Sequence, residues 1–374
     1  MMDKKNNKIH IVNEEDEEVR FLDEHDKLVV NNDKITVVDK FSKTNLEEHG
    51  DVDQKINDIE DKEEIDDIQL IDESDSSDLI DAAKNLNKSE NDVKNIIFEE
   101  FSRLIETIEK DFIKNYKRKR YNFLLSQFDE LVTATMVFVS SFESKSGNAI
   151  ERVAERVARL KFGEENVPSI INPRGIKHNI DPYSVEGQII VTDINLDDGK
   201  LKGEISTFRA SNVAKGKGKN RVKSGVNQES IKTLLQVGQD FKQINEVYTK
   251  PVDLAFFDGE NWNLLELKAG GQLDSSNAPS NVEKLLSIYT GVNYENTKIY
   301  FATLYNKDGE GNTWSGSPKK HMAYPEMFLI GKNLWDKILP NDISFEKFTE
   351  LYQIAMEEID LNERIKEMIR KGIE

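Results

Sequence analysis

One short stretch, PVDLAFFDGENWNLLELKAGG from Pro251 to Gly271, sets the strongest limit on the fold. It contains two apolar runs, residues 254–257 and 262–267, separated by Asp-Gly-Glu-Asn, which is the polar composition of a hairpin turn. Both runs are apolar on both faces, which is typical of interior strands in a sheet that is covered on each side. The sequence therefore predicts a buried hairpin at the centre of a layered domain.

This hairpin carries three charged residues where only apolar ones are expected. If residues 258–261 form the loop, Phe257 faces Trp262, and counting back pair by pair places Asp253 opposite Glu266. Facing residues have Cβ atoms roughly 4.5–5.5 Å apart. Lys268 lies two residues beyond Glu266 and therefore on the same face. The pattern predicts that the three charges converge at one end of the hairpin.

Two neighbouring carboxylates in an apolar setting repel each other unless a cation or a proton lies between them. Mg²⁺ prefers oxygen ligands and keeps several waters, so two carboxylates, a backbone carbonyl and a substrate phosphate suffice to hold it. A lysine beside such a site can orient an attacking water and offset charge on a phosphate. The chemistry indicated is metal-assisted phosphodiester hydrolysis. The alternative is a structural salt-bridge cluster made by the same three residues.

Asp253, followed after twelve residues by Glu266-Leu267-Lys268, resembles the D…(D/E)-x-K signature of the PD-(D/E)XK nuclease superfamily. The proline of the family motif normally precedes the aspartate directly, whereas Val252 separates Pro251 from Asp253 here. The continuation through LELKAGGQLDSSNAPSNVEKLL and KIYFATLYNKDGEGNTWSGSPKKH is similar to type II restriction endonucleases, and most to the TdeIII-like group.

This resemblance implies an α/β fold with a mixed central sheet flanked by helices. It implies that Asp253, Glu266 and the carbonyl of Leu267 bind Mg²⁺, and that Lys268 is the catalytic lysine. Many members also place a glutamate from an early helix near the metal, for which Glu151 is the first candidate and Glu155 the second.

The activity implied is Mg²⁺-dependent, sequence-specific cleavage of double-stranded DNA by a restriction enzyme. A cognate DNA methyltransferase is then expected as a separate protein, and a homodimer is expected if the DNA site is palindromic. Two alternatives stay open: a repair or junction nuclease of the same superfamily, and a non-catalytic DNA-binding or interaction module.

The net charge of −19 is concentrated in one part of the chain. Residues 1–92 hold 29 acids and 12 bases, which leaves 41 acids and 39 bases for residues 93–374. Strong like charge with few aromatic residues predicts a mostly disordered acidic tail, in which IHIV, KLVV and KITVV are short strand-like pieces. The endonuclease domain is expected over 93–374, with N-terminal helices at 93–140, a catalytic core at 141–340 and C-terminal helices at 341–374.

Two helices are expected early in this domain, one with an apolar stripe from Ile97 to Phe112 and one over residues 124–132. The basic cluster Lys117–Arg120 is expected between them. A separate helix is expected to begin at about Gly147 and to stop at Gly163, which places Glu151 in its first turn.

Basic residues in two loops are the candidate DNA contacts. The segment VAKGKGKNRVKSGV lacks the Ser or Thr that a phosphate-binding loop requires after its lysine, so it indicates a mobile positive loop instead. The candidates are Lys215, Lys217, Lys219, Arg221 and Lys223 in that loop and Lys319 and Lys320 in a later one.

Cysteine is absent, which excludes disulfides, thiolate metal sites and a cysteine nucleophile. No apolar run of about 18 residues occurs, so no membrane interaction is expected. With no apolar N-terminal segment to act as a signal, the sequence predicts a cytoplasmic protein.

Overall fold

The computed structural model describes residues 85–216, 222–270 and 276–373, together with the backbone of four short strands near the N-terminus. The chain divides into two compact units, Met1–Glu73 and Ser74–Glu374. In the first, β1 (His10–Val12) pairs antiparallel with β2 (Glu18–Phe21), and β3 (Asp26–Asn31) pairs antiparallel with β4 (Lys34–Asp39). The three strand-like pieces of the tail thus contribute to β1, β3 and β4. The disorder predicted for the rest of the tail lies outside the described residues.

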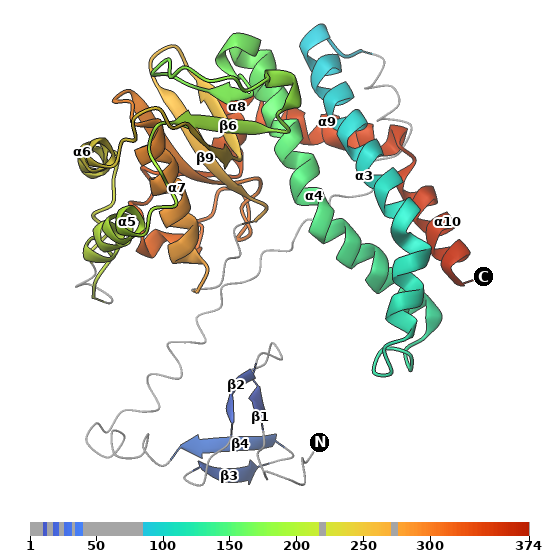
Figure 1. Ribbon diagram of the computed structural model, residues 1–374. Coiled ribbons are helices and arrows are strands. Elements are labelled where there is room, and N and C mark those ends of the chain that lie inside the picture. Colours follow the sequence, from blue (N-terminus) through green and yellow to red (C-terminus); the bar gives the residue numbers. More distant parts are fainter. Residues whose placement is uncertain are drawn as a thin grey trace. The chain divides into compact units, whose positions relative to one another are not determined.

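A pair of long helices opens the second unit (Figure 1). Helix α3 (Lys88–Arg120) begins five residues before the predicted domain start, because Asn87 and Glu90 form a reciprocal capping box. Its predicted apolar stripe is confirmed, with Ile97, Phe101 and Phe112 buried. The basic cluster Lys117–Arg120 was expected after the helix but forms its last turn, where positive charge stabilises the helix dipole.

Helix α4 (Glu130–Phe162) is one continuous helix of 33 residues, so the separate start predicted near Gly147 is wrong. It crosses the boundary expected between residues 140 and 141, and Glu151 lies in its interior. Gly163 ends it as predicted, with φ of 89°. The continuity follows from packing, because Ala134, Val137 and Val153 all lie in the core shared with α3.

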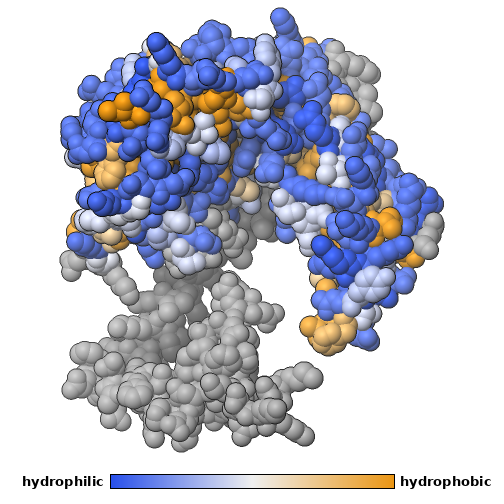
Figure 2. Space-filling model, in the orientation of Figure 1, coloured by the Kyte–Doolittle hydropathy of each residue, from blue (hydrophilic) through white to orange (hydrophobic). Residues whose placement is uncertain are grey.

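The helix predicted over residues 124–132 is also wrong in its first half, because residues 121–128 form turns between α3 and α4. Figure 2 shows hydrophobic residues at this end of the helix pair. They are exposed rather than buried: Tyr121, Phe123, Leu124, Phe128, Leu131 and Val132.

The main sheet has the strand order β11-β10-β9-β8, formed by β8 (Leu254–Phe257), β9 (Trp262–Lys268), β10 (Thr297–Thr303) and β11 (Phe328–Ile330). The β8–β9 pair is antiparallel, whereas β9–β10 and β10–β11 are parallel, so the sheet is mixed as expected. A second sheet contains β5 (Ile170–Ile171), β6 (Gln188–Thr192) and β7 (Tyr248–Val252), with β5–β6 parallel and β6–β7 antiparallel.

Helices cover both faces of the β8–β9 hairpin, as predicted, although β8 is the edge strand in the order of this sheet. On one face Leu254, Leu265 and Leu267 belong to the core that contains α3 and α4. On the other, Ala255 and Leu264 belong to a core with α7 (Ala278–Val292), the helix that connects β9 to β10. Helices α5 (Gly199–Ser211) and α6 (Thr233–Asp240) pack on α7. The fold is therefore mixed α/β.

The buried side chain of Gln188 joins the two sheets. Its Nε2 donates to the carbonyl of Ala255 at 2.8 Å, and its Oε1 accepts from the N–H of Ala255 at 2.7 Å. Asp253 interrupts the chain between β7 and β8, so this amide links β6 to β8 just beyond that residue. The sheets are thereby fixed together next to the candidate site.

The C-terminal part consists of α8 (Lys332–Ile338), α9 (Phe345–Glu358) and α10 (Leu361–Ile373). Ser344 caps the start of α9, because its hydroxyl accepts from the N–H of Lys347 at 3.1 Å. Short 3-10 turns occur at Glu164–Asn166, Pro182–Ser184, Ser230–Lys232 and Ser317–Lys320. Among the described helices, none is both long and apolar enough to span a bilayer.

Candidate active site

The strand register brings Asp253 and Glu266 together as predicted. Phe257 pairs with Trp262 and Leu254 with Leu265, so the next position on each strand is occupied by Asp253 and Glu266. The N–H of Leu267 donates to Asp253 Oδ2 at 2.9 Å, which fixes the aspartate against β9. The turn is held by Asp258, whose Oδ1 accepts from the N–H of Asn261.

Lys268 joins the two carboxylates on the same face. Its Nζ lies 2.7 Å from Glu266 Oε1 and 3.7 Å from Asp253 Oδ2. The Glu266 side chain is 1 % exposed, whereas Lys268 is 28 % exposed, so the lysine reaches the buried acid from the solvent side. All three residues of the D…(D/E)-x-K pattern thus meet at one end of the hairpin.

A fourth charged residue, Lys284 of α7, was not predicted. Its Nζ lies 2.6 Å from Glu266 Oε2 and 3.0 Å from Asp253 Oδ1. One signal for it was present in the sequence, because Lys284 stands among Val282, Leu285 and Leu286 in a helix that directly follows the carboxylate strand. A lone cation beside an apolar stripe indicates a buried acidic partner.

Opposing effects act on the protonation of these groups. Burial raises the pKa of Glu266, and the charge of Asp253 raises it further, while the two lysines lower it. Burial acts to lower the pKa of Lys284, but the charges of Asp253 and Glu266 outweigh it, so this pKa is raised. Two carboxylates and two ammonium groups therefore compensate one another in a largely dry setting.

Glu151 is electrostatically part of this cluster, although it lies on α4. Burial raises its pKa to about 7, and the charges of Asp253 and Glu266 contribute to the increase. Glu155, the second candidate, forms an ion pair with Arg159, and its pKa is raised by burial without a contribution from Asp253 or Glu266. Of the two glutamates, only Glu151 interacts with the cluster.

The donor atoms at this site suit a hard divalent cation. Both oxygens of Glu266 are buried, and among the described residues their charged partners are the ammonium groups of Lys268 and Lys284, at 2.7 and 2.6 Å. Carboxylate oxygens are donors that Mg²⁺ prefers. Within the described part of the chain, no group of three or more His, Asp or Glu side chains is arranged to hold a metal. The candidate donor set is therefore two carboxylates, together with the carbonyl of Leu267, which directly follows Glu266 in sequence.

The two basic segments predicted to contact DNA lie side by side. The N–H of Ala214 donates to the carbonyl of Lys320 at 2.8 Å, and Lys215 forms a β-bridge with Val222. Lys215, Lys223 and Lys320 are exposed. Lys319 instead contacts the carbonyl of Trp314 and lies 4.1 Å from the Tyr324 ring centroid. The other three candidates of the loop, Lys217, Lys219 and Arg221, lie outside the described residues.

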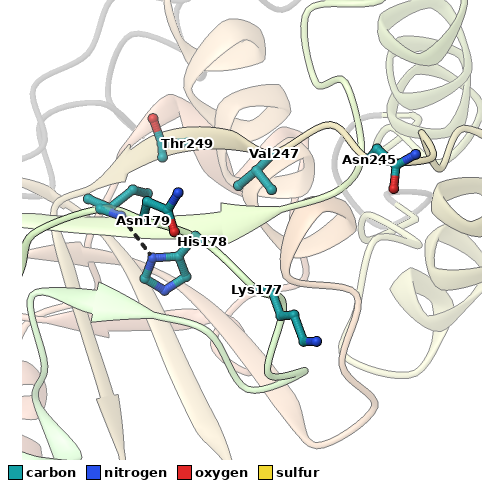
Figure 3. A pocket seen from close by; sticks show the side chains of 7 residues that line it. Lys177, His178, Asn179, Asn245, Val247 and Thr249 are labelled. Carbon is teal, nitrogen blue, oxygen red and sulfur yellow. Dashed lines mark hydrogen bonds between the residues drawn. The ribbon is translucent and has the colours of Figure 1, made fainter.

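An open polar pocket of about 920 Å³ lies beside β7 and was not anticipated from the sequence (Figure 3). It is lined by Lys177, His178, Asn179, Ile180, Asn245, Val247 and Thr249. Thr249 precedes Asp253 by four residues, which corresponds to roughly 13 Å along an extended strand. Side chains with hydrogen-bonding groups thus lie near the carboxylates, at a distance that corresponds to a few base pairs along a DNA duplex.

Comparison with known families supports a nuclease assignment for the part of the chain that holds the hairpin. Residues 200–355 match the family model described as type II restriction endonuclease, HinfI. The matched segment includes Asp253, Glu266, Lys268 and Lys284 but not Glu151. The TdeIII-like group expected from the sequence is not supported, because the match is to the HinfI family. No curated protein and no solved structure matches the chain. A restriction endonuclease family implies a DNA endonuclease.

Proposed function

We propose that this protein is a type II restriction endonuclease of the HinfI kind, which hydrolyses phosphodiester bonds at a specific sequence in double-stranded DNA with Mg²⁺. The observation that carries the proposal is the approach of the Lys268 ammonium to within 4 Å of both Asp253 and Glu266 in a segment that matches this family. A PD-(D/E)XK core, a homodimer on palindromic DNA and a separate cognate methyltransferase belong to the same proposal.

Each residue of the cluster has a role that follows from its position. Asp253, Glu266 and the Leu267 carbonyl would hold the metal, which when bound supplies Lewis-acid activation of water and neutralises charge on the phosphate. Lys268 is partly exposed and is anchored by Glu266, so its ammonium can orient a water and offset negative charge on the phosphate. Glu151 can accept a proton near pH 7, which suits a group that exchanges protons with solvent at the site.

DNA would contact the exposed basic surface near Lys215 and Lys320 through its phosphates. The pocket that contains Lys177, His178 and Asn245 supplies donors and acceptors of the type that read base edges. Both surfaces belong to the same compact unit as the carboxylates. Affinity and sequence selection would thus come from different parts of the protein.

The test is incubation of the purified protein with unmethylated phage DNA in Mg²⁺ or in EDTA. We expect discrete Mg²⁺-dependent bands from the wild type and from Glu260→Gln, which changes an exposed acid in the turn of the same hairpin. Glu266→Gln should give none. A smear would indicate a nonspecific or structure-selective nuclease of the superfamily. Intact DNA with every metal tried would instead favour a binding module with a structural charge cluster.

A further inference from the structure

The ammonium of Lys284 bridges the two carboxylates at shorter distances than the ammonium of Lys268 does. Its Nζ is within 3.0 Å of both acids, whereas Lys268 approaches Glu266 to 2.7 Å but Asp253 only to 3.7 Å. The ammonium of Lys284 therefore bridges the oxygen atoms to which the proposed function assigns a divalent metal.

A bridging cation at this point stabilises the metal-free protein. Glu266 is 1 % exposed, so its carboxylate has little water to screen it from Asp253. Breaking such a buried pair by removing one partner is strongly destabilising because it leaves an uncompensated charge. A divalent cation would supply the same compensation, so the two cations compete for the same oxygen atoms.

A hollow beside Lys284 can receive its side chain. A pocket of about 230 Å³ is lined by Lys284, Lys202 and Lys250, with Ser280, Ser287 and Glu283 also in its wall. Lys202 and Lys250 both lie near Asp197, at 2.8 and 3.7 Å. Asp197 and Glu283 offset two of the three lysine charges around this hollow, and the remaining positive charge suits a DNA phosphate.

We propose that Lys284 is a built-in counter-cation that a divalent metal displaces. In the metal-free protein its ammonium bridges Asp253 and Glu266 and holds them in the arrangement that binds metal. When a metal enters, the lysine turns into the hollow with Lys202 and Lys250, where its charge serves a phosphate of the DNA. Lys284 is thus a positioning residue in the metal-free protein. This inference rests on the proposed function, since it takes the carboxylates as metal ligands.

Calorimetric titration of the full-length protein with Mn²⁺ tests the competition directly. Removing the competing charge in Lys284→Met should lower the Kd for Mn²⁺ at least about tenfold, because one cation fewer holds the carboxylates. Lys284→Arg keeps the charge and should bind Mn²⁺ within about threefold of the wild type. The control is Lys337→Met, which removes a similarly buried lysine from Asp258 at the other end of the hairpin and should leave the Kd unchanged.

Thermal unfolding in EDTA supplies a second readout. Lys284→Met should unfold at a lower temperature than the wild type without metal, and Mn²⁺ should raise its midpoint by more than it raises that of the wild type. If Lys284→Met does not fold, Lys284→Gln removes the charge while keeping a hydrogen-bonding group. An equal or weaker Mn²⁺ affinity in the folded neutral variant would overturn the inference while leaving the proposed function intact. A wild type that binds no divalent cation would instead contradict the proposed function itself.

Discussion

At the scale of single residues, a substitution of Lys268 distinguishes a catalytic role of the charge cluster from a structural one. We expect Lys268→Met to lower the cleavage rate by at least about 100-fold, because it removes the partly exposed ammonium beside the proposed reacting phosphate. Lys284 still neutralises the carboxylates in this variant, so the free energy of unfolding should fall by no more than about 2 kcal/mol. Cleavage and DNA binding measured on the folded variant would check this. Unchanged cleavage with a large loss of stability would show a structural cluster.

Glu151 predicts a pH dependence of stability in the metal-free protein. Its folded-state pKa of about 7 lies above the ordinary value of 4.5, so the folded protein binds the proton more tightly than the unfolded chain. The contribution of Glu151 to the free energy of unfolding is therefore fully present below about pH 4.5 and is lost as the pH rises through 7.

In Glu151→Gln this pH-dependent loss disappears. Urea unfolding in EDTA would measure the free energy of unfolding of both proteins. Between pH 5 and pH 8 the variant should gain about 1–2 kcal/mol relative to the wild type. This value is smaller than the full effect of the pKa shift because the Glu151 side chain is partly exposed. Parallel pH profiles for the two proteins would contradict the placement of Glu151 in the charge cluster.

The convergence of Asp253, Glu266 and Lys268 could be predicted because it depends only on a local turn and on the two-residue period of strands. For Lys284 the sequence offers only its place in an apolar stripe, since the contact itself requires α7 to fold back over the strand that precedes it. The choice between Glu151 and Glu155 likewise depends on how α4 is rotated against the sheet, which its own periodicity does not determine.

At the scale of elements, Gln188 links two sheets that the chain itself separates at Asp253. Gln188→Leu should lower the free energy of unfolding by about 2–4 kcal/mol, because it leaves the N–H and carbonyl of Ala255 buried without these partners. Chemical denaturation would measure this. Gln236→Leu, which changes a residue on α6 whose amide contacts only Asp240, is the matched control and should cost under about 1 kcal/mol. A loss for Gln188→Leu as small as that of the control would show that the sheets are joined by other contacts.

The β8–β9 hairpin could be predicted more accurately than the long helices. It follows from two apolar runs with clear turn residues between them. Four serines, Gly147 and Asn148 within residues 140–148 favour a break in helix α4, yet the continuous apolar face against α3 stabilises the helix through them. The apolar residues of the turn at residues 121–128 have helical spacing, but they are exposed, so no packing stabilises a helix there.

At the scale of the whole molecule, the distribution of charge predicts an effect of the N-terminal part on DNA binding. Residues 1–84 make up most of the acidic segment 1–92, and we expect this segment to compete with DNA for the basic surface near Lys215 and Lys320. Deleting them should raise the affinity for nonspecific duplex DNA at low salt by about tenfold or more. The difference should shrink above about 0.3 M salt because screening weakens both interactions. Fluorescence anisotropy with a labelled duplex that lacks a cleavage site would measure it, and equal affinities at low salt would dispose of the competition.

The most direct test of the metal centre is anomalous diffraction from crystals of the wild-type protein soaked in Mn²⁺. We expect a peak about 2.1–2.2 Å from oxygens of both Asp253 and Glu266, close to the Leu267 carbonyl. Lys284 should then lie away from the carboxylates, in the hollow with Lys202 and Lys250. A peak at another site, or no peak while Lys284 still bridges the two acids at high Mn²⁺ concentration, would contradict the assignment of this hairpin as a metal-dependent nuclease centre.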